Sequence, residues 1–239
     1  MQVEVGLEMS PSPIHVLAVD DEPDLCALSK DFLEMSEAME VETACSVSEA
    51  RAALGQRHFD VIVSDYQMPE EDGIQFLKSL RAAGDRTPFI LFTGKGREDV
   101  VIEALNRGAD AYLQKGGKSV PQYAELANMI EKAVQRRRME LDLIENEEKF
   151  KNIFDSANDS IHILDLDGRI LEINDIGCKW LGYTKQKMLR KKIGDIDSEQ
   201  YAKQVPERMK EVIERGFALF ETEWLTRSGQ LIPVEVSGY

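Results

Sequence analysis

Three acidic residues stand directly after runs of apolar residues. Asp20 and Asp21 follow "HVLAV", and Asp65 follows "DVIVS". If these runs are neighbouring strands of a parallel sheet, the three carboxylates converge at the carboxyl edge of that sheet. Close carboxylates repel one another unless a hard divalent cation neutralises them, and Mg²⁺ prefers oxygen ligands. The sequence therefore predicts a Mg²⁺ site at this edge.

Phosphoryl transfer needs two more groups near these acids, a cation and a hydroxyl donor. Lys115 follows the run "AYLQ", and Thr93 ends the run "PFILFT". A carboxylate beside Mg²⁺ can attack a phosphoryl group while the metal and the ammonium offset the charge on its oxygens. Taken singly, Asp21 also fits a helix N-cap and Lys115 a surface lysine. Their order at four strand ends predicts a phosphoryl group on Asp65.

The stretch "PFILFTGKGRED" raises the alternative of a nucleotide-binding P-loop, because a Gly-Lys pair follows an apolar run. A P-loop needs a glycine about five residues before that pair and a Ser or Thr after the lysine. Phe89 and Gly96 occupy those positions, so no P-loop is predicted. A phosphate here would instead sit on Asp65 and contact Thr93, with Gly94 leaving room for the backbone to approach.

The residues between 15 and 115 must position these groups, and they alternate between two patterns. Five short β-branched runs, from "HVLAVD" to "AYLQK", are separated by four amphipathic stretches, and residues 120–138 supply a fifth helix. Runs that are apolar on both faces, with helices between them, predict a parallel sheet that is covered on both sides. We therefore expect an α/β fold with a doubly wound five-stranded parallel sheet.

Four segments together resemble the receiver domain of two-component response regulators: "VLAVDDEPDL", "DVIVSDYQMPEEDGIQFL", "ILFTGKG" and "GADAYLQKG". The resemblance covers residues 13–138 and implies a flavodoxin-like fold. It implies that Asp65 is the phosphoacceptor for a partner histidine kinase. It also implies that Asp21, Asp65 and the backbone carbonyl of Gln67 bind Mg²⁺, with Asp20 assisting through water.

Two further residues take roles from the same resemblance. It implies that Thr93 and Tyr112 form a switch, in which the hydroxyl moves toward the phosphate and the ring turns inward. Such a change is a shift between two packings, driven by the better contacts of the phosphate in one of them. The chain departs from the family after Lys115, where Gly116 and Gly117 replace the usual proline. The rigidity of this corner, but not its charge, is expected to differ.

One long helical stretch is predicted from residue 121 to 155, overlapping the end of the receiver-like part and the start of the next domain. An apolar stripe runs along it and is interrupted by the arginines 136–138. The stripe consists of Leu126, Ile130, Ala133, Leu141 and Ile144. It fits a connector that pairs with a second copy, and equally one domain's last helix running into the next. The three arginines are expected to form a solvated face.

Residues 147–239 predict a second domain with antiparallel sheet. "SIHILDLDGRILEIN" indicates a hairpin around an Asp-Gly turn, and "LFETEWLT" with "LIPVEVSGY" indicates another. Short helical pieces and a longer helix, "YAKQVPERMKEVIERGF", lie between the two hairpins. This part resembles an α+β PAS domain whose final strand is missing, which suggests truncation at the C-terminus.

The resemblance leaves the ligand of this second domain open, because PAS domains include haem, flavin and small-metabolite sensors as well as modules that only dimerise. Haem is disfavoured because the longer helix has no histidine to serve as an axial ligand. Flavin photochemistry is disfavoured because "KKIGDI", where the reactive cysteine would fall, contains none. We expect His162 to be an ordinary strand residue, and Trp180 and Trp224 to be core residues.

The bulk composition argues against several classes of partner. With 44 acidic and 29 basic residues the formal charge is -15, which disfavours nucleic acid and anionic lipid. Cys26, Cys45 and Cys178 lack CxxC spacing, so we expect small buried hydrophobes without a disulfide or zinc. The absence of a signal sequence and of a run of about 18 apolar residues predicts a cytoplasmic segment without a membrane span.

Three functions compete for this pattern. The first is a two-component signalling protein whose receiver relays the state of Asp65 through the helix to the PAS domain, with a homodimer through either part. The second is a Mg²⁺ phosphohydrolase of the haloacid-dehalogenase type, but that family has a second acid two residues after its nucleophile, where this chain has Gln67. The third is a receiver-like binding module that is never phosphorylated, which the filled acidic, hydroxyl and lysine positions disfavour.

The histidines argue against a kinase within this segment. His15, His58 and His162 lie at predicted strand or loop positions, and none lies on a helix that could serve as a kinase dimerisation helix. The segment is therefore predicted to accept phosphoryl groups without being an enzyme.

Overall fold

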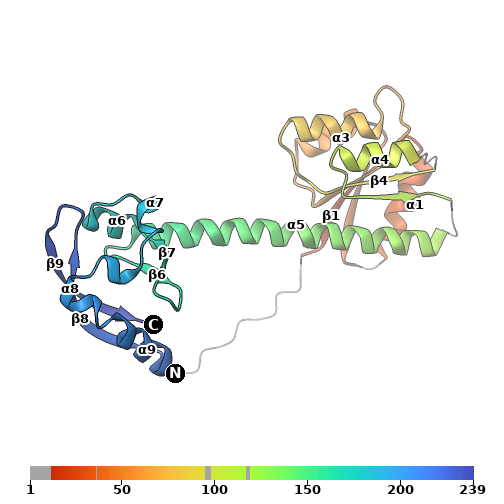
Figure 1. The fold of residues 1–239 in the computed structure, drawn as a ribbon. Helices are drawn as coiled ribbons and strands as arrows, with labels where there is room; N and C mark the ends of the chain where they lie inside the picture. The colour runs from red at the N-terminus through yellow and green to blue at the C-terminus, as the bar shows by residue number, and fades with distance from the viewer. Residues whose placement is uncertain (1–11, 36, 95–97, 117–118) are drawn as a thin grey trace. The chain divides into compact units, whose positions relative to one another are not determined.

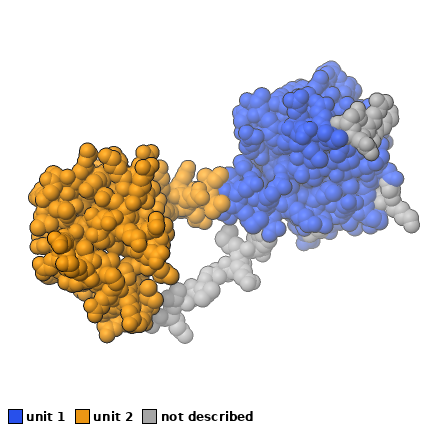
Figure 2. Space-filling model, in the orientation of Figure 1, with its two compact units in different colours: residues 1–142 blue, residues 143–239 orange. Residues whose placement is uncertain are grey.

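The computed structural model describes residues 12–35, 37–94, 98–116 and 119–239. Gly96 and Gly117, discussed above, lie outside these ranges. The chain divides into two compact units, residues 1–142 and 143–239, and each is described by itself (Figure 2). Within the described ranges, no helix is both long and apolar enough to cross a membrane.

The first unit is built on one parallel sheet of five strands in the order β2-β1-β3-β4-β5 (Figure 1). Its strands are β1 (Ile14–Val19), β2 (Met39–Ala44), β3 (Val61–Ser64), β4 (Phe89–Thr93) and β5 (Ala111–Gln114). The helices that alternate with them are α1 (Pro23–Glu34), α2 (Val47–Leu54), α3 (Gly73–Ala82), α4 (Glu98–Asn106) and α5 (Ser119–Ser156). The doubly wound α/β fold predicted from the sequence is confirmed, with the first and third strands as neighbours.

Both faces of this sheet are buried, because the side chains of each strand alternate between them. In β1, Leu17 and Val19 belong to a core cluster with side chains of α2, α3 and α4, whereas Val16 and Ala18 belong to one with side chains of α1 and α5. All four are at most 3% exposed. Burial on two sides explains why the strands are unbroken apolar runs and do not alternate with polar residues.

Helix α5 continues without a break over 38 residues. Its first half packs on the sheet, where Leu126, Ile130 and Val134 are at most 2% exposed. Leu141 and Ile144, the later members of the predicted stripe, are 49% and 50% exposed. The stripe therefore has a buried part that belongs to the first unit and a half-exposed part beyond it.

The second unit contains two separate antiparallel sheets, β6-β7 and β8-β9. Its elements are β6 (His162–Leu164), β7 (Ile170–Ile173), α6 (Asp175–Leu181), α7 (Lys185–Met188), the 3₁₀ helix η1 (Ile193–Asp195), α8 (Glu199–Ala202), α9 (Val205–Arg215), β8 (Ala218–Leu225) and β9 (Leu231–Gly238). In the Asp-Gly turn, Gly168 has a φ of 74°, the left-handed conformation that glycine favours. Both predicted hairpins are therefore present.

Two predictions for the second unit are wrong. The helix predicted over residues 201–217 is two helices, α8 and α9. Pro206 lies in the first turn of α9, where its missing N–H breaks no hydrogen bond, so a helix begins there instead of running through. Trp224 is buried, as predicted, but Trp180 is 43% exposed, and Leu181 takes the core position at the end of α6.

The three cysteines have three different environments, and all are free thiols. Cys26 is buried and donates from Sγ to the Asp20 carbonyl at 3.3 Å, and burial raises its pKa to about 12. Cys178 is partly buried, as a small hydrophobe would be. The prediction fails for Cys45, which is exposed just after β2.

Candidate functional site

Asp20 and Asp65 are brought together by the pairing of β1 with β3. Val19 and Ser64, the last residues of the two strands, are register partners, and the Asp65 N–H donates to the Val19 carbonyl at 2.8 Å. The residue that follows each strand is therefore an acid at the same sheet edge. Asp20 and Asp65 are 7% and 8% exposed, so both carboxylates are largely removed from water.

Lys115 reaches both carboxylates from the end of β5. Its N–H donates to the Thr93 carbonyl at 2.8 Å, which extends the pairing of β5 with β4. Its ammonium forms ion pairs with Asp20 Oδ2 and with Asp65 Oδ1, the latter at 2.9 Å. Burial acts to lower the Lys115 pKa, but the hydrogen bonds and charges of the two acids outweigh it and the pKa is raised. One cation thus compensates two buried anions.

The remaining oxygen of each acid is held by the backbone. Asp20 Oδ1 accepts from the Glu22 N–H at 3.0 Å, and Asp65 Oδ2 accepts from the Gln67 N–H at 2.7 Å. Each carboxylate therefore closes a short turn with the residue two positions later. The backbone and Lys115 together fix the orientation of both carboxylates.

Thr93 and Tyr112 lie on the adjacent strands β4 and β5. Thr93 ends β4, is 1% exposed and pairs in register with Gln114. Tyr112 pairs in register with Leu91 and packs partly buried against the core on the α2, α3 and α4 face. Burial raises the pKa of its hydroxyl. The two residues predicted to form a switch are therefore on neighbouring strands, and Thr93 is the one next to Lys115.

Asp21 and Gln67, the other residues predicted to bind Mg²⁺, are exposed beside the buried acids. In the part of the chain that the structure describes, no group of three or more His, Cys, Asp or Glu side chains is arranged to hold a metal ion. The Lys115 ammonium instead contacts both Asp20 and Asp65. The candidate donors are carboxylate and carbonyl oxygens, the ligands that Mg²⁺ prefers, so they fit this metal in kind.

Two family models match the chain, that of the response regulator receiver domain over residues 16–121 and that of the PAS domain over residues 158–239. The chain carries a receiver domain followed by a PAS domain. This combination belongs to two-component signalling, as the resemblance implied. The phosphohydrolase and the never-phosphorylated module gain no support from these matches.

Three curated relatives show how far the similarity extends. Protein PetR of Rhodobacter capsulatus is 38% identical over 107 residues, which cover 45% of this chain and 44% of PetR. Response regulator Rre1 of Synechocystis sp. is 36% identical over 105 residues, which cover 43% of this chain and 46% of Rre1. The methyl sulfide methyltransferase-associated sensor of Methanosarcina acetivorans is 34% identical over 96 residues, 40% of this chain and 10% of that sensor. The chain spans less than half the length of each relative.

Solved receiver domains match a similar share of the chain. The receiver domain of Francisella response regulator 1452 is 30% identical with a TM-score of 0.47, and the match covers 52% of this chain and 98% of that one. A receiver domain protein of Clostridium thermocellum is 28% identical with a TM-score of 0.47, covering 53% of this chain and 98% of that one.

Gly73 of the receiver supports the site and was not predicted to do so. It begins α3, and a Cβ there would overlap the backbone carbonyl oxygen of Asp65 and lie 3.1 Å from Leu91 Cδ1. Glycine therefore lets α3 approach the backbone of Asp65 closely. The available signal was "EDG" before an amphipathic run, since Asp72 forms a capping box with Gln75 that fixes where α3 begins.

Two other glycines near the receiver site differ in what they require. Among the residues that the structure describes, a Cβ at Gly94 would meet only Lys115 Cβ, at 3.9 Å, so packing within the protein does not require glycine there, and the expected room for a phosphate stays a prediction. Gly116 has a φ of 131°, which other residues rarely adopt. Proline, whose φ is fixed near about −65°, cannot take this conformation. The departure from the family after Lys115 thus comes with a backbone that favours glycine.

Proposed function

We propose that Asp65 is the phosphoacceptor of this receiver and takes its phosphoryl group from a partner histidine kinase. The observation that supports this best is the ammonium of Lys115, which contacts both Asp20 and Asp65 at the carboxyl edge of the sheet. An ammonium placed there can stabilise charge as it develops on the phosphoryl oxygens. The segment would act as a phosphoacceptor and not as an enzyme that turns over a substrate.

The proposed step transfers a phosphoryl group from the donor histidine to a carboxylate oxygen of Asp65. A bond forms between an Asp65 carboxylate oxygen and phosphorus while the phosphorus–nitrogen bond of the donor histidine breaks. The hydrogen bond from Gln67 N–H holds the carboxylate in place, and Lys115 is within reach of the new phosphoryl group. The buried hydroxyl of Thr93 would donate to one phosphoryl oxygen.

The same edge holds the residues that would bind Mg²⁺. These are Asp20, Asp21, Asp65 and the backbone carbonyl of Gln67. When bound, the metal would supply positive charge to the phosphoryl oxygens. Asp20 and Asp65 would then share their negative charge between the metal and Lys115.

The phosphorylated state would be relayed through α5 to the PAS domain, which would act as a sensor or interaction module. Thr93 and Tyr112 would form the switch, because they lie on the two strands nearest to Lys115. A homodimer would use the PAS domain or the exposed part of α5, where Leu143 and Ile144 are 61% and 50% exposed. We place this segment in the cytoplasm together with its kinase, and assign no ligand to the PAS domain.

Intact-mass analysis after incubation with acetyl phosphate and Mg²⁺ tests the proposal. The native chain is compared with Asp65→Asn and with Asp31→Asn, which makes the same charge change at an exposed position of α1. We expect one added phosphoryl group on the native chain and on Asp31→Asn, and none on Asp65→Asn. A phosphoryl group on Asp65→Asn, or none on the native chain with either acetyl phosphate or its kinase, would reject the proposal.

A further inference from the structure

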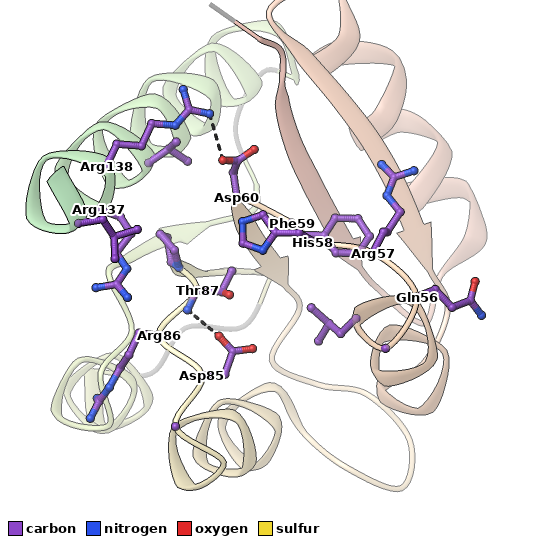
Figure 3. A pocket seen from close by; sticks show the side chains of 16 residues that line it. Gln56, Arg57, His58, Phe59, Asp60, Asp85, Arg86, Thr87, Arg137 and Arg138 are labelled. Atoms are coloured by element: carbon purple, nitrogen blue, oxygen red, sulfur yellow. Dashed lines mark hydrogen bonds and ion pairs between the residues drawn. The ribbon is translucent and has the colours of Figure 1, made fainter. Parts of the chain in front are cut away.

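A pocket of about 640 Å³ lies in the first unit at the amino ends of β3 and β4, the edge of the sheet opposite to that of Asp65. It is formed by the segments that lead into β3 and β4 and by α5 (Figure 3). The three arginines of "RRR", predicted to be a solvated face, contribute two of its side chains, Arg137 and Arg138. Nothing in the receiver chemistry described above uses this pocket.

The lining of the pocket is positively charged in a chain whose formal charge is -15. Its arginines are Arg57, Arg86, Arg137 and Arg138, and its acids are Asp60 and Asp85. His58 lies between the arginines of α5 and Arg57 (Figure 3). An excess of cationic side chains in a concave site attracts anions and repels cations.

The two acids of the pocket are already bound to groups of the protein. Asp60 accepts from the backbone N–H of His15 at 2.9 Å and forms an ion pair with Arg138 at 3.0 Å. Asp85 accepts from the backbone N–H of Thr87 at 2.7 Å. Asp60 is thus paired with Arg138, whereas Asp85 keeps its negative charge, so the four arginines exceed the two acids of the lining by two charges.

Arg86 and Arg137 are the arginines with the weakest compensation. Arg137 pairs at 3.4 Å with Glu140, its neighbour on the same helix, and such exposed pairs contribute little. Arg86 is exposed and forms no ion pair with any residue that the structure describes. Both lie on the same side of the pocket (Figure 3). Nearby Arg81 pairs with Asp110 at 3.6 Å, so Arg86 and Arg137 are the cations that a bound anion would stabilise.

We propose that this pocket binds a phosphate-bearing small molecule of nucleotide size through Arg86 and Arg137. The planar guanidinium group can donate two parallel hydrogen bonds to a pair of phosphate oxygens. The volume falls within the range of about 300–1,000 Å³ that is typical of small-molecule sites. Leu54, Val134 and Leu141 supply an apolar part of the lining for the rest of the ligand.

The position of the pocket gives its occupancy a structural consequence. Val134, Arg137 and Leu141 belong to α5, whereas Arg86 belongs to the segment before β4. A ligand held by both would add contacts between the receiver and the part of α5 that leads out of it. The pocket would therefore provide an input to α5 that does not depend on Asp65.

Calorimetric titration of the full chain with ATP, pyrophosphate and adenosine tests the ligand class. Mg²⁺ is left out, so that phosphate is not recruited by a metal at the Asp65 edge, and the salt is kept low because screening weakens the contacts. We expect ATP to bind, with pyrophosphate weaker because it lacks the apolar contacts, and adenosine not to bind. Absence of ATP binding at about 1 mM, which corresponds to less than about 4 kcal/mol, or adenosine binding as tightly as ATP, would overturn the proposal.

Matched arginine variants test the site. Arg137→Gln and Arg86→Gln should each weaken ATP binding about tenfold or more, because each removes a charge-assisted contact. Arg136→Gln makes the same charge change one residue away, at a side chain that pairs with Asp110, and should leave the affinity within about twofold. Asp65→Asn should also leave it unchanged, which separates this proposal from the phosphoacceptor role. Equal weakening by Arg136→Gln and Arg137→Gln would show general electrostatic attraction and overturn the site.

Discussion

The receiver and the PAS unit bury their polar groups in different ways. At the carboxyl edge of the receiver, three charged side chains compensate one another, with Lys115 bound to Asp20 and Asp65. In the PAS unit, His162 stacks on Trp224 with ring centroids 5.0 Å apart, and its Nε2 shares a hydrogen bond of 2.9 Å with the Ser160 hydroxyl. The first arrangement is a network of charges, and the second is a partly buried histidine packed against a core tryptophan.

The two arrangements differ in how strongly they indicate a reaction. Ionisable groups of opposite charge at converging strand ends are costly to assemble, and they form a site where charge can move. A single histidine between a hydroxyl and an aromatic ring also occurs in ordinary packing, so it does not by itself indicate a reaction. Loss of the charge network should therefore cost the most stability, and changes to its support, to the partly buried histidine and to α5 should cost progressively less.

Removal of the central cation should have the largest effect. Lys115→Ala leaves Asp20 and Asp65 facing each other without compensation, and we expect the free energy of unfolding to fall by about 4 kcal/mol. Labelling by acetyl phosphate should be lost as well. Urea unfolding followed by circular dichroism measures the first effect, and intact mass measures the second.

The control for this variant is a lysine in an exposed ion pair. Lys78 pairs with Glu103 at 2.9 Å, and both side chains are more than a third exposed, at 40% and 46%. Lys78→Ala should change the free energy of unfolding by less than about 1 kcal/mol. Millimolar Mg²⁺ should restore part of the stability of Lys115→Ala, because the metal replaces the missing cation. Equal losses for the two variants would mean that the buried ion pairs of Lys115 contribute no more to stability than an exposed pair does.

The second-largest loss of stability is expected for a substitution at Gly73, which lies beside the charged side chains. Gly73→Ala places a Cβ against the backbone carbonyl of Asp65, and relief of that overlap has to move α3 or the loop after β3. We expect a loss of about 3 kcal/mol and slower labelling of Asp65. Gly94→Ala, whose Cβ would find its nearest neighbour at 3.9 Å, should stay within about 0.5 kcal/mol of the native chain. Equal free energies of unfolding for the two variants would show that α3 or the loop after β3 moves without loss of stability.

The same contrast explains how much of the receiver site is predictable from sequence. Asp20, Asp65 and Lys115 can be placed together from the strand pattern alone, because parallel strands end at one edge of the sheet however far apart they are in the chain. The role of Gly73 was missed because its overlap with Asp65 depends on how closely α3 approaches β3, which spacing does not encode. The arginine-lined pocket was missed for a similar reason, since three separated segments form it.

In the PAS unit the local signals were correct where they concerned turns and wrong where they concerned faces. The Asp-Gly dipeptide identified a hairpin because the turn itself requires glycine at Gly168. Trp180 and Trp224 could not be distinguished, because aromatic character alone does not say which side of an element meets the core. Pro206 in the predicted long helix is itself a signal that a helix begins there.

Acid should destabilise the PAS unit through His162. Burial lowers its pKa to about 4, whereas an unfolded histidine has a pKa of about 6.5. Between these values the unfolded state binds a proton that the folded state does not. The free energy of unfolding is therefore unaffected by protonation of His162 above about pH 6.5. It falls as the pH falls toward 4, by on the order of 2 kcal/mol after allowance for partial exposure.

Tryptophan fluorescence isolates this effect, because both tryptophans, Trp180 and Trp224, belong to the PAS unit. Urea unfolding is measured at pH 7 and at pH 4.5 for the native chain and for His162→Phe, which keeps a ring to stack on Trp224. The loss between the two pH values should be smaller in the variant by about that amount. His58→Gln, at an exposed position of the receiver, should behave like the native chain. If His162→Phe loses as much stability as the native chain, the histidine is not neutral in the folded state.

The smallest effect is expected in the half-exposed part of α5 between the two regions. Leu141 is 49% exposed, so Leu141→Ala should lower the free energy of unfolding by no more than about 0.5 kcal/mol, independently of protein concentration. Leu126→Ala, in the same helix but fully buried on the receiver sheet, should cost about 3 kcal/mol. Urea unfolding at two protein concentrations, together with sedimentation, measures both. A larger loss at Leu141 that grows with concentration would show that this part of the helix packs against a second copy of the chain. Its apolar stripe would then serve two purposes, packing on the receiver sheet in its first half and self-association in its second.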